Sequence, residues 1–241
     1  MNLQGDKSMK RLDSKKALEL LFKDVILSND DLEKEENRWI KHCLYVGIAA
    51  GRIADVLGLD SDYAIALGYV HDIGRKISHP NHVIEGYKYM VKHGFSEEAR
   101  SCVTHSFIDN NIYYVAGTVL KSSDKIAYMN KFLSDLGLNT YDNVIQLCDL
   151  FCLETGFTTL EKRLLDIYTR KGVFENTKAH LEKVMELRAR LEKAMECSLY
   201  ELFPEIDATV LDQVNQDYDK LIDLLNNNLI DFENKLIKKS E

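Results

Sequence analysis

The chain has 241 residues, of which 45% are hydrophobic and 29% charged, and its net charge is −8. This composition is typical of a globular protein rather than a disordered one. A chain this acidic disfavours non-specific binding to nucleic acid, which needs a basic surface. Only 2 prolines and 12 glycines interrupt the sequence, so we expect long helices rather than a sheet with many tight turns.

The cysteines and the apolar runs indicate the cellular compartment. The five cysteines are odd in number and lie in helix-like apolar segments, which argues against a disulfide framework. Residues 1–8 lack the apolar centre of a signal peptide, and no run approaches the roughly 18 apolar residues that span a membrane. We therefore expect a cytoplasmic protein in a reducing environment, with no membrane partner.

The first part of the chain predicts three helices. Apolar residues recur at helical spacing over residues 14–28, and again over residues 32–57, where Gly58 ends the run. Asp60-Ser61 caps a third, strongly apolar helix that ends at His71-Asp72. Gly74 follows, and we expect it to let the backbone turn.

Further helices are predicted to the end of the chain, with Thr158 and Glu161 forming a capping box. Residues 112–120 stay ambiguous between helix and extended chain. The predicted helices in this part span residues 80–93, 97–105, 123–136, 143–154, 159–170, 176–197 and 208–238, the last interrupted at 226–228.

The sequence therefore predicts an all-α fold. Residues 1–36 would form an N-terminal leader and helix, residues 37–172 the domain that carries the site, and residues 173–241 a helical extension packed on that domain.

The positions of the histidine and aspartate residues relative to the predicted helices predict a metal site. His71 and Asp72 are adjacent, and an imidazole and a carboxylate side by side can bind one divalent metal. Helix bundles build such sites from inward-facing side chains on several helices. The candidate ligands lie on or at the ends of predicted helices and are His42, His71, Asp72, His82, His105 and Asp149.

The order of these residues resembles the H…HD…D signature of the HD superfamily of metal-dependent phosphohydrolases. His71-Asp72-Ile73-Gly74 is similar to the family's frequent HDIG form. His82-Val83-Ile84-Glu85-Gly86 and Thr104-His105-Ser106 resemble the two further histidine segments of binuclear members, although Val83 stands where proline is usual. Leu147-Cys148-Asp149 resembles the helix with the last ligand, and Thr159 to Leu164 resembles the segment after it. The resemblance covers residues 37–172.

The resemblance implies an HD-domain helical bundle with one or two divalent metals. The metal would be Fe, Mn, Ni, Co or Zn, with Mg also compatible. His82 and His105 would bind a second ion, with Asp72 as the bridge and a catalytic residue. Arg75, as a catalytic and substrate-binding residue, and Lys76, as a substrate-binding residue, would stabilise charge on a phosphoryl group.

Some assignments stay open at the level of sequence. Asp124, in a segment similar to that near the final aspartate of binuclear members, is a rival to Asp149, which we prefer for its apolar helical setting. His79, His93 and His180 are interpreted as surface or capping residues.

The predicted function is a metal-dependent phosphohydrolase, a phosphomonoesterase or phosphodiesterase, acting on a nucleotide or another small phosphate ester. The alternatives are a di-iron oxygenase of the same superfamily and a non-catalytic metal- or nucleotide-binding regulatory module. The expected partner is a small phosphorylated molecule and not nucleic acid. The extension after residue 172 would either cover the site or form a homodimer.

Overall fold

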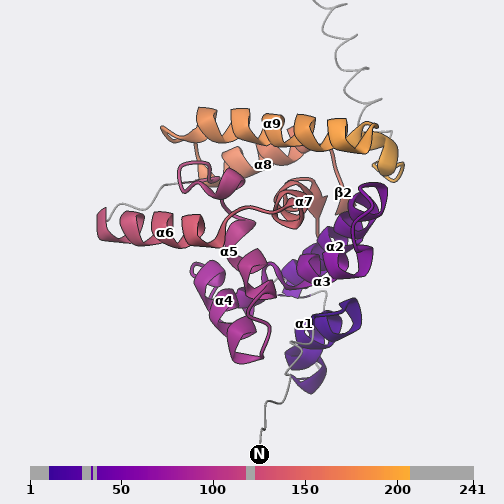
Figure 1. Ribbon diagram of the computed structural model, residues 1–241, viewed down its shortest axis with the longest axis vertical. Coiled ribbons are helices and arrows are strands. Elements are labelled where there is room, and N and C mark those ends of the chain that lie inside the picture. Colours follow the sequence, from indigo (N-terminus) through magenta and orange to yellow (C-terminus); the bar gives the residue numbers. More distant parts are fainter. Residues whose placement is uncertain (1–10, 29–33, 35–36, 118–122, 207–241) are drawn as a thin grey trace, which may run out of the picture. The chain divides into compact units, whose positions relative to one another are not determined.

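A computed structural model describes residues 11–28, 34, 37–117 and 123–206 (Figure 1). The all-α prediction is confirmed, since helices make up nearly all of its regular structure. The helices are α1 (Ser14–Ser28), α2 (Arg38–Val56), α3 (Ser61–Val70), α4 (His82–Lys92), α5 (Ser101–Thr104), α6 (Ser123–Leu136), α7 (Thr140–Asp149), α8 (Leu160–Lys171) and α9 (Thr177–Met195).

Short elements connect these helices. Strands β1 (Cys152–Leu153) and β2 (Gly156–Phe157) form a small antiparallel hairpin in which Cys152 faces Phe157. The 3₁₀ turns are η2 (Ile73–Lys76), η3 (Glu98–Arg100), η4 (Ile108–Asn110) and η5 (Leu199–Leu202). In the part of the chain described, no helix is long and apolar enough to cross a membrane.

Helices α2 and α3 pack closely because glycines lie where they meet. A Cβ on Gly68 would lie 2.5 Å from the Cα of Gly47, and one on Gly51 would lie 2.6 Å from the side chain of Ile65. The absence of these side chains lets the two backbones approach. This close packing brings His42 on α2 near the end of α3, where His71 and Asp72 follow.

Helix α1 packs on α3 through a cluster that includes Leu12, Ala17 and Leu20. Leu12 is buried and its backbone N–H donates to Glu98 Oε1 at 3.0 Å. The end of the predicted N-terminal leader is therefore packed against the rest of the fold. Residues 1–10 lie outside the described part.

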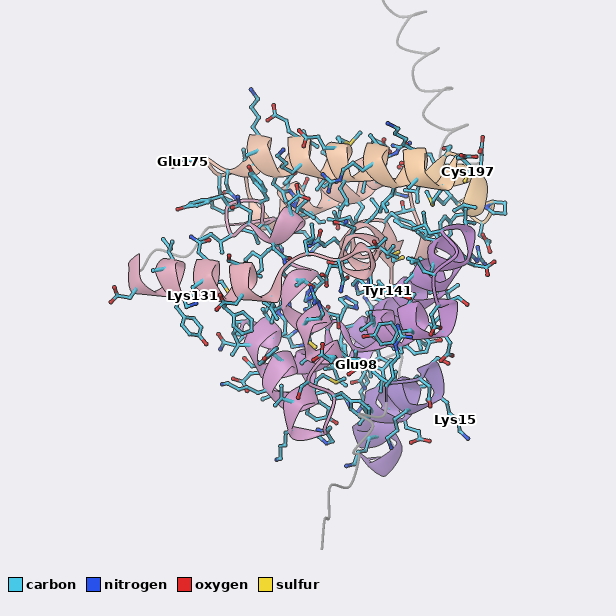
Figure 2. The ribbon with its side chains drawn as sticks, viewed as in Figure 1. Lys15, Glu98, Lys131, Tyr141, Glu175 and Cys197 are labelled. Atoms are coloured by element: carbon cyan, nitrogen blue, oxygen red, sulfur yellow. The ribbon has the colours of Figure 1, made fainter. Side chains whose placement is uncertain are left out.

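Helix α7 lies between two sets of helices in Figure 1, with α2 and α3 on one side and α8 and α9 on the other. Side chains fill the space beneath α9, whose two ends are marked by Glu175 and Cys197 in Figure 2. The apolar stripe of α9 is buried at Val184, Leu187 and Leu191. The predicted helix over 208–238 lies outside the described residues.

Several predicted boundaries were wrong for identifiable reasons. The predicted helix over 143–154 ends at Asp149, because the chain turns into the hairpin closed by Gly156 at φ 137°. The predicted helix over 97–105 is divided between η3 and α5. The cap of α8 is Thr159 rather than Thr158, since its side chain accepts a hydrogen bond from the backbone N–H of Lys162.

Candidate metal centre

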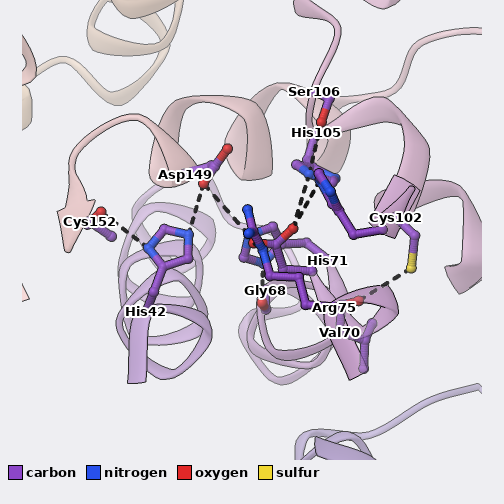
Figure 3. Close-up of polar contacts among 12 residues, drawn as sticks. His42, Gly68, Val70, His71, Arg75, Cys102, His105, Ser106, Asp149 and Cys152 are labelled. Carbon is purple, nitrogen blue, oxygen red and sulfur yellow. Dashed lines mark hydrogen bonds and ion pairs between the residues drawn. The ribbon is translucent and has the colours of Figure 1, made fainter. Parts of the chain in front are cut away.

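The structure brings all six predicted ligands together. Figure 3 shows His42, His71, His105 and Asp149 among them. His42 lies on α2, His71 and Asp72 follow α3, and His82 is the first residue of α4. His105 follows α5, and Asp149 is the last residue of α7. Each side chain is at least largely buried, so the cluster is a feature of the interior and not an exposed acidic patch.

Hydrogen bonds to backbone carbonyls orient the four imidazole rings. Because a carbonyl oxygen only accepts, each Nδ1 must carry the proton, which leaves the Nε2 lone pair for a metal. Three of the rings fold back onto a carbonyl three or four residues earlier. The pairs are His42 Nδ1 with Cys152 O at 3.2 Å, His71 with Gly68 O at 2.7 Å, His82 with His79 O at 2.8 Å and His105 with Ser101 O at 2.9 Å.

The first group of potential ligands joins α2, α3 and α7. His42 Nε2 lies 2.8 Å from Asp149 Oδ1, and His71 Nε2 lies 3.6 Å from the same oxygen. His71 Nε2 also lies 3.8 Å from Asp72 Oδ2. Two imidazole nitrogens and two carboxylates therefore converge, a donor set that suits a divalent transition metal.

The second group shares Asp72 with the first. Asp72 Oδ1 lies 3.3 Å from His82 Nε2 and 3.5 Å from His105 Nε2. The same His105 nitrogen accepts a hydrogen bond from Ser106 Oγ at 3.0 Å. Because the two oxygens of Asp72 face different histidines, this carboxylate connects the two groups of potential ligands and would be available to both.

Two buried atoms in the centre lack a hydrogen-bond partner, namely His71 Nε2 and Asp72 Oδ1. Buried polar atoms are nearly always satisfied, and an orphaned one in a native fold calls for an explanation such as an ion. Both atoms point among the other potential ligands, as Figure 3 shows for His71. The residues present therefore fit a divalent metal.

The charges within the centre hold its carboxylates in the anionic form. Burial raises the pKa of Asp72, but the charges of His71 and Arg75 outweigh it and hold that pKa far below its usual range. For Asp149, burial is likewise outweighed by the adjacent side chains of His42 and His71, so its pKa is well below the usual value. Ionised carboxylates are the form that binds metal.

Burial and neighbouring charge also set the state of two rings. Burial and then the charge on His71 lower the pKa of His105 to about 3. Burial likewise lowers the pKa of His82, although the charge on Asp72 opposes it. Both rings are therefore neutral at neutral pH, which is the form in which imidazole binds metal.

The glycine after His71-Asp72 matters for a different reason from the one predicted. Gly74 does not have a positive φ. A Cβ there would lie 1.9 Å from the backbone oxygen of His82 and 2.4 Å from the backbone nitrogen of Gly86. The absence of a side chain lets α4 lie directly against η2, which brings His82 within reach of Asp72.

The comparisons with known proteins agree with this geometry. Residues 39–152 match the HD domain family, a range that contains all six residues of the centre. This part of the chain is an HD domain. The chain is also 24% identical over 164 residues to Ribonuclease Y of Thermus thermophilus, an alignment that covers 65% of this chain and 28% of that protein. No solved structure matches the chain.

HD domains bind divalent metals and are typically metal-dependent hydrolases, so the family and the donor set point to the same chemistry. Within this HD domain, Asp149 and not Asp124 joins the histidines. Asp124 is exposed near the start of α6 and belongs to none of the clusters found among the described residues.

The two predicted substrate-binding cations have different positions. Arg75 Nε donates to Asp72 Oδ2 at 2.5 Å, and the side chain lines the cavity above the centre. Lys76 donates instead to the backbone oxygen of Leu20 at 2.6 Å, on the side of α1, and is not part of that lining. The structure therefore brings Arg75 to the centre and does not bring Lys76 there.

A cavity of about 750 Å³ opens at the HD-domain centre. His42, Asp72, His105 and Asp149 form part of its wall. Further cations that the sequence prediction missed also line it, and most come from α8, outside the matched range. They are Arg38, Lys162, Arg163, Arg170 and Lys171. The sequence carries only a weak signal for this. Arg163 and Arg170, seven residues apart, share one face of the helix, whereas Lys162 and Lys171, nine residues apart, lie on opposite sides of it. Only the folded structure shows that all four line the cavity.

His180 is the predicted surface histidine that the structure places differently. It is only 2% exposed, lines the same cavity from α9, and its Nδ1 lies 2.9 Å from Tyr168 Oη. Burial, followed by the charge of Lys171, lowers its pKa to about 4. The prediction failed because nothing in the sequence shows that α9 covers this side of the cavity.

Proposed function

We propose that this protein is a metal-dependent phosphohydrolase that acts on a nucleotide or another small phosphate ester. The observation that carries the proposal is the cluster of six side chains at the wall of a cavity that also holds Arg75. Backbone carbonyls hold the Nδ1 atoms of its four imidazole rings, and the Nε2 atoms face the carboxylates of the cluster. A divalent metal bound there would activate water and neutralise charge on a phosphate group.

The protein's own residues would supply the orientation and the remaining charge. Asp72 would bridge the two groups of histidines, and Arg75 would hold that carboxylate in place through its Nε. Arg75 also lines the cavity, where its charge would stabilise negative charge on the phosphoryl group. The cavity volume of about 750 Å³ suits a small-molecule ligand, whose pockets measure roughly 300–1,000 Å³.

The test is phosphate release from a panel of nucleotides and simple phosphate esters, with the protein loaded separately with Mn, Fe, Co, Ni and Mg. We expect turnover with at least one metal, and we expect Asp72→Ala to abolish it and to lower the metal content. Lys178→Ala, on the exposed surface of α9, is the matched control and should change neither.

Three outcomes would contradict the proposal. Metal binding without any phosphate release would favour a regulatory module. Oxygen uptake by the iron-loaded protein, with a mixed-valent EPR signal coupled to turnover, would identify a di-iron oxygenase. Phosphate release that persists in Asp72→Ala would place the activity outside this centre.

A further inference from the structure

Helix α8 forms a second charged part of the cavity wall, apart from the metal centre. It contributes four cations, Lys162, Arg163, Arg170 and Lys171, and one carboxylate, Asp166. The protein as a whole has a net charge of −8, whereas this part of the cavity wall has more cations than carboxylates. A cleft lined by one sign of charge attracts ligands of the opposite sign.

The one acidic side chain that α8 contributes to the wall cannot neutralise it. Asp166 is shared, accepting from Arg163 at 3.0 Å and from both Nε and an Nη of Arg170 at 3.0 and 2.7 Å. Lys171 donates to the neutral backbone oxygen of Ala116. No carboxylate pairs with Lys162 among the residues that the structure describes. The α8 wall therefore retains positive charge.

The same wall has hydrogen-bonding capacity that the protein does not use. The Nε of Arg163 is buried without a hydrogen-bond partner. A buried guanidinium N–H without an acceptor is costly, and an anionic ligand would satisfy it.

The α8 wall and the HD-domain centre line the same cavity, to which Lys171, Asp149 and Arg75 all contribute. Burial lowers the pKa of Lys171, and the charge of Arg75 lowers it further, whereas the charge of Asp149 opposes both effects. Lys171 therefore lies within electrostatic range of one residue of the centre and of the arginine beside it. A ligand that reaches the metal centre would also reach this part of the wall.

Building on the proposed function, we propose that α8 is a second anion subsite, so that the substrate is a small phosphate ester with a second phosphate group. The phosphate to be cleaved would lie at the HD-domain centre and the other phosphate at Lys162, Arg163 and Lys171. A nucleoside diphosphate or triphosphate has this chemistry. The subsite lies in the part of the chain after residue 152, beyond the match to the HD family.

The experiment measures the binding of AMP, ADP, ATP and inorganic tripolyphosphate by calorimetry, with and without Mn²⁺. The test variant is Lys162→Gln/Lys171→Gln, which leaves the Asp166 ion pairs intact. The matched control is Lys178→Gln/Lys193→Gln, which removes two cations from α9 outside the cavity. Hydrolysis of p-nitrophenyl phosphate, which has a single phosphate, is measured in parallel.

We expect the wild-type protein to bind tripolyphosphate and ATP at least about tenfold more tightly than AMP, since one charge-assisted hydrogen bond corresponds to roughly this factor. The test variant should lose about tenfold for tripolyphosphate but less than about twofold for AMP, and the control should lose neither. The control variant should keep the wild-type kcat for p-nitrophenyl phosphate.

Equal affinity of the test variant and the wild-type protein for tripolyphosphate would overturn the subsite, and so would an equal loss in the control. Tight binding of a short oligoribonucleotide with no preference for ATP over AMP would overturn the small-molecule class. The two proposals fail separately. If binding depends on the α8 cations but no phosphate is released, the phosphohydrolase proposal is refuted and the subsite proposal is supported. If phosphate is released but binding does not depend on the α8 cations, the phosphohydrolase proposal is supported and the subsite proposal is refuted.

Discussion

Replacing Gly74 with alanine tests how the two halves of the metal centre are held together. Gly74 lies in η2 against the first turn of α4, the helix that begins with His82. The new methyl group would lie 1.9 Å from the backbone oxygen of His82 and 2.4 Å from the backbone nitrogen of Gly86. Both atoms belong to backbone, so no side-chain rotation can relieve the contact.

The size of the effect follows from that geometry. To restore an ordinary contact, α4 would have to move by about 1.5 Å, and overpacking of this kind costs roughly 3 kcal/mol. For a chain of this length we expect a fall in Tm of roughly 6–12 °C. His82 would move with α4 and leave Asp72, whereas the group of His42, His71 and Asp149 would stay, so we expect the metal content to fall by about one ion per chain.

The assay combines thermal unfolding with elemental analysis of protein loaded with excess Mn²⁺ and then desalted. The control is Gly58→Ala, where φ is 66° and a Cβ would meet nothing within 4 Å. That substitution should cost about 1–2 kcal/mol through backbone strain and leave the metal content unchanged. If Gly74→Ala unfolds at the wild-type temperature and retains the full metal content, the close approach does not hold the centre together.

Three further predictions concern single residues. Asp149→Ala should lower the metal content by about one ion per chain and turnover by about a hundredfold, while Asp124→Ala should change neither. The reverse result in elemental analysis would show that the last ligand is misassigned. Asp142→Ala should cost about 3–5 kcal/mol in urea unfolding, because it leaves the largely buried Arg100 without its bidentate partner, yet metal content should hold. The pKa of His180 falls from 6.5 to about 4 on folding, so protonation favours the unfolded chain; its contribution to stability is complete above pH 6.5 and declines as the pH falls toward 4. The free energy of unfolding of His180→Gln should therefore fall less than that of the wild-type protein between pH 6.5 and 4. An equal fall for both proteins over that pH range would contradict this.

Much of the fold and the residue types of the centre could be read from the sequence. The helical class follows from apolar periodicity and the scarcity of breakers, which are local properties. The His71-Asp72 pair and the order of the other histidines and aspartates could be recognised because the ligand types are set by metal chemistry. Boundaries such as the end of α7 at Asp149 were missed, because they depend on the hairpin that buries Phe151 and Cys152.

Only the tertiary structure decided which of the equivalent residues belong to the site. Asp124 and Asp149 are alike as isolated carboxylates, and only the packing of α7 against α2 places Asp149 beside His42. Likewise Arg75 and Lys76 are adjacent cations, but they leave η2 in different directions, one toward Asp72 and the other toward α1.

The cavity itself is a property of the folded chain, because its wall joins α2, α7, α8 and α9, which lie far apart in sequence. The sequence by itself therefore determined a helical protein with a His-Asp metal centre. The tertiary structure determined the meeting of His42 with Asp149, the position of Asp72 between the two groups of histidines and the basic wall of α8, since each depends on contacts between separate segments.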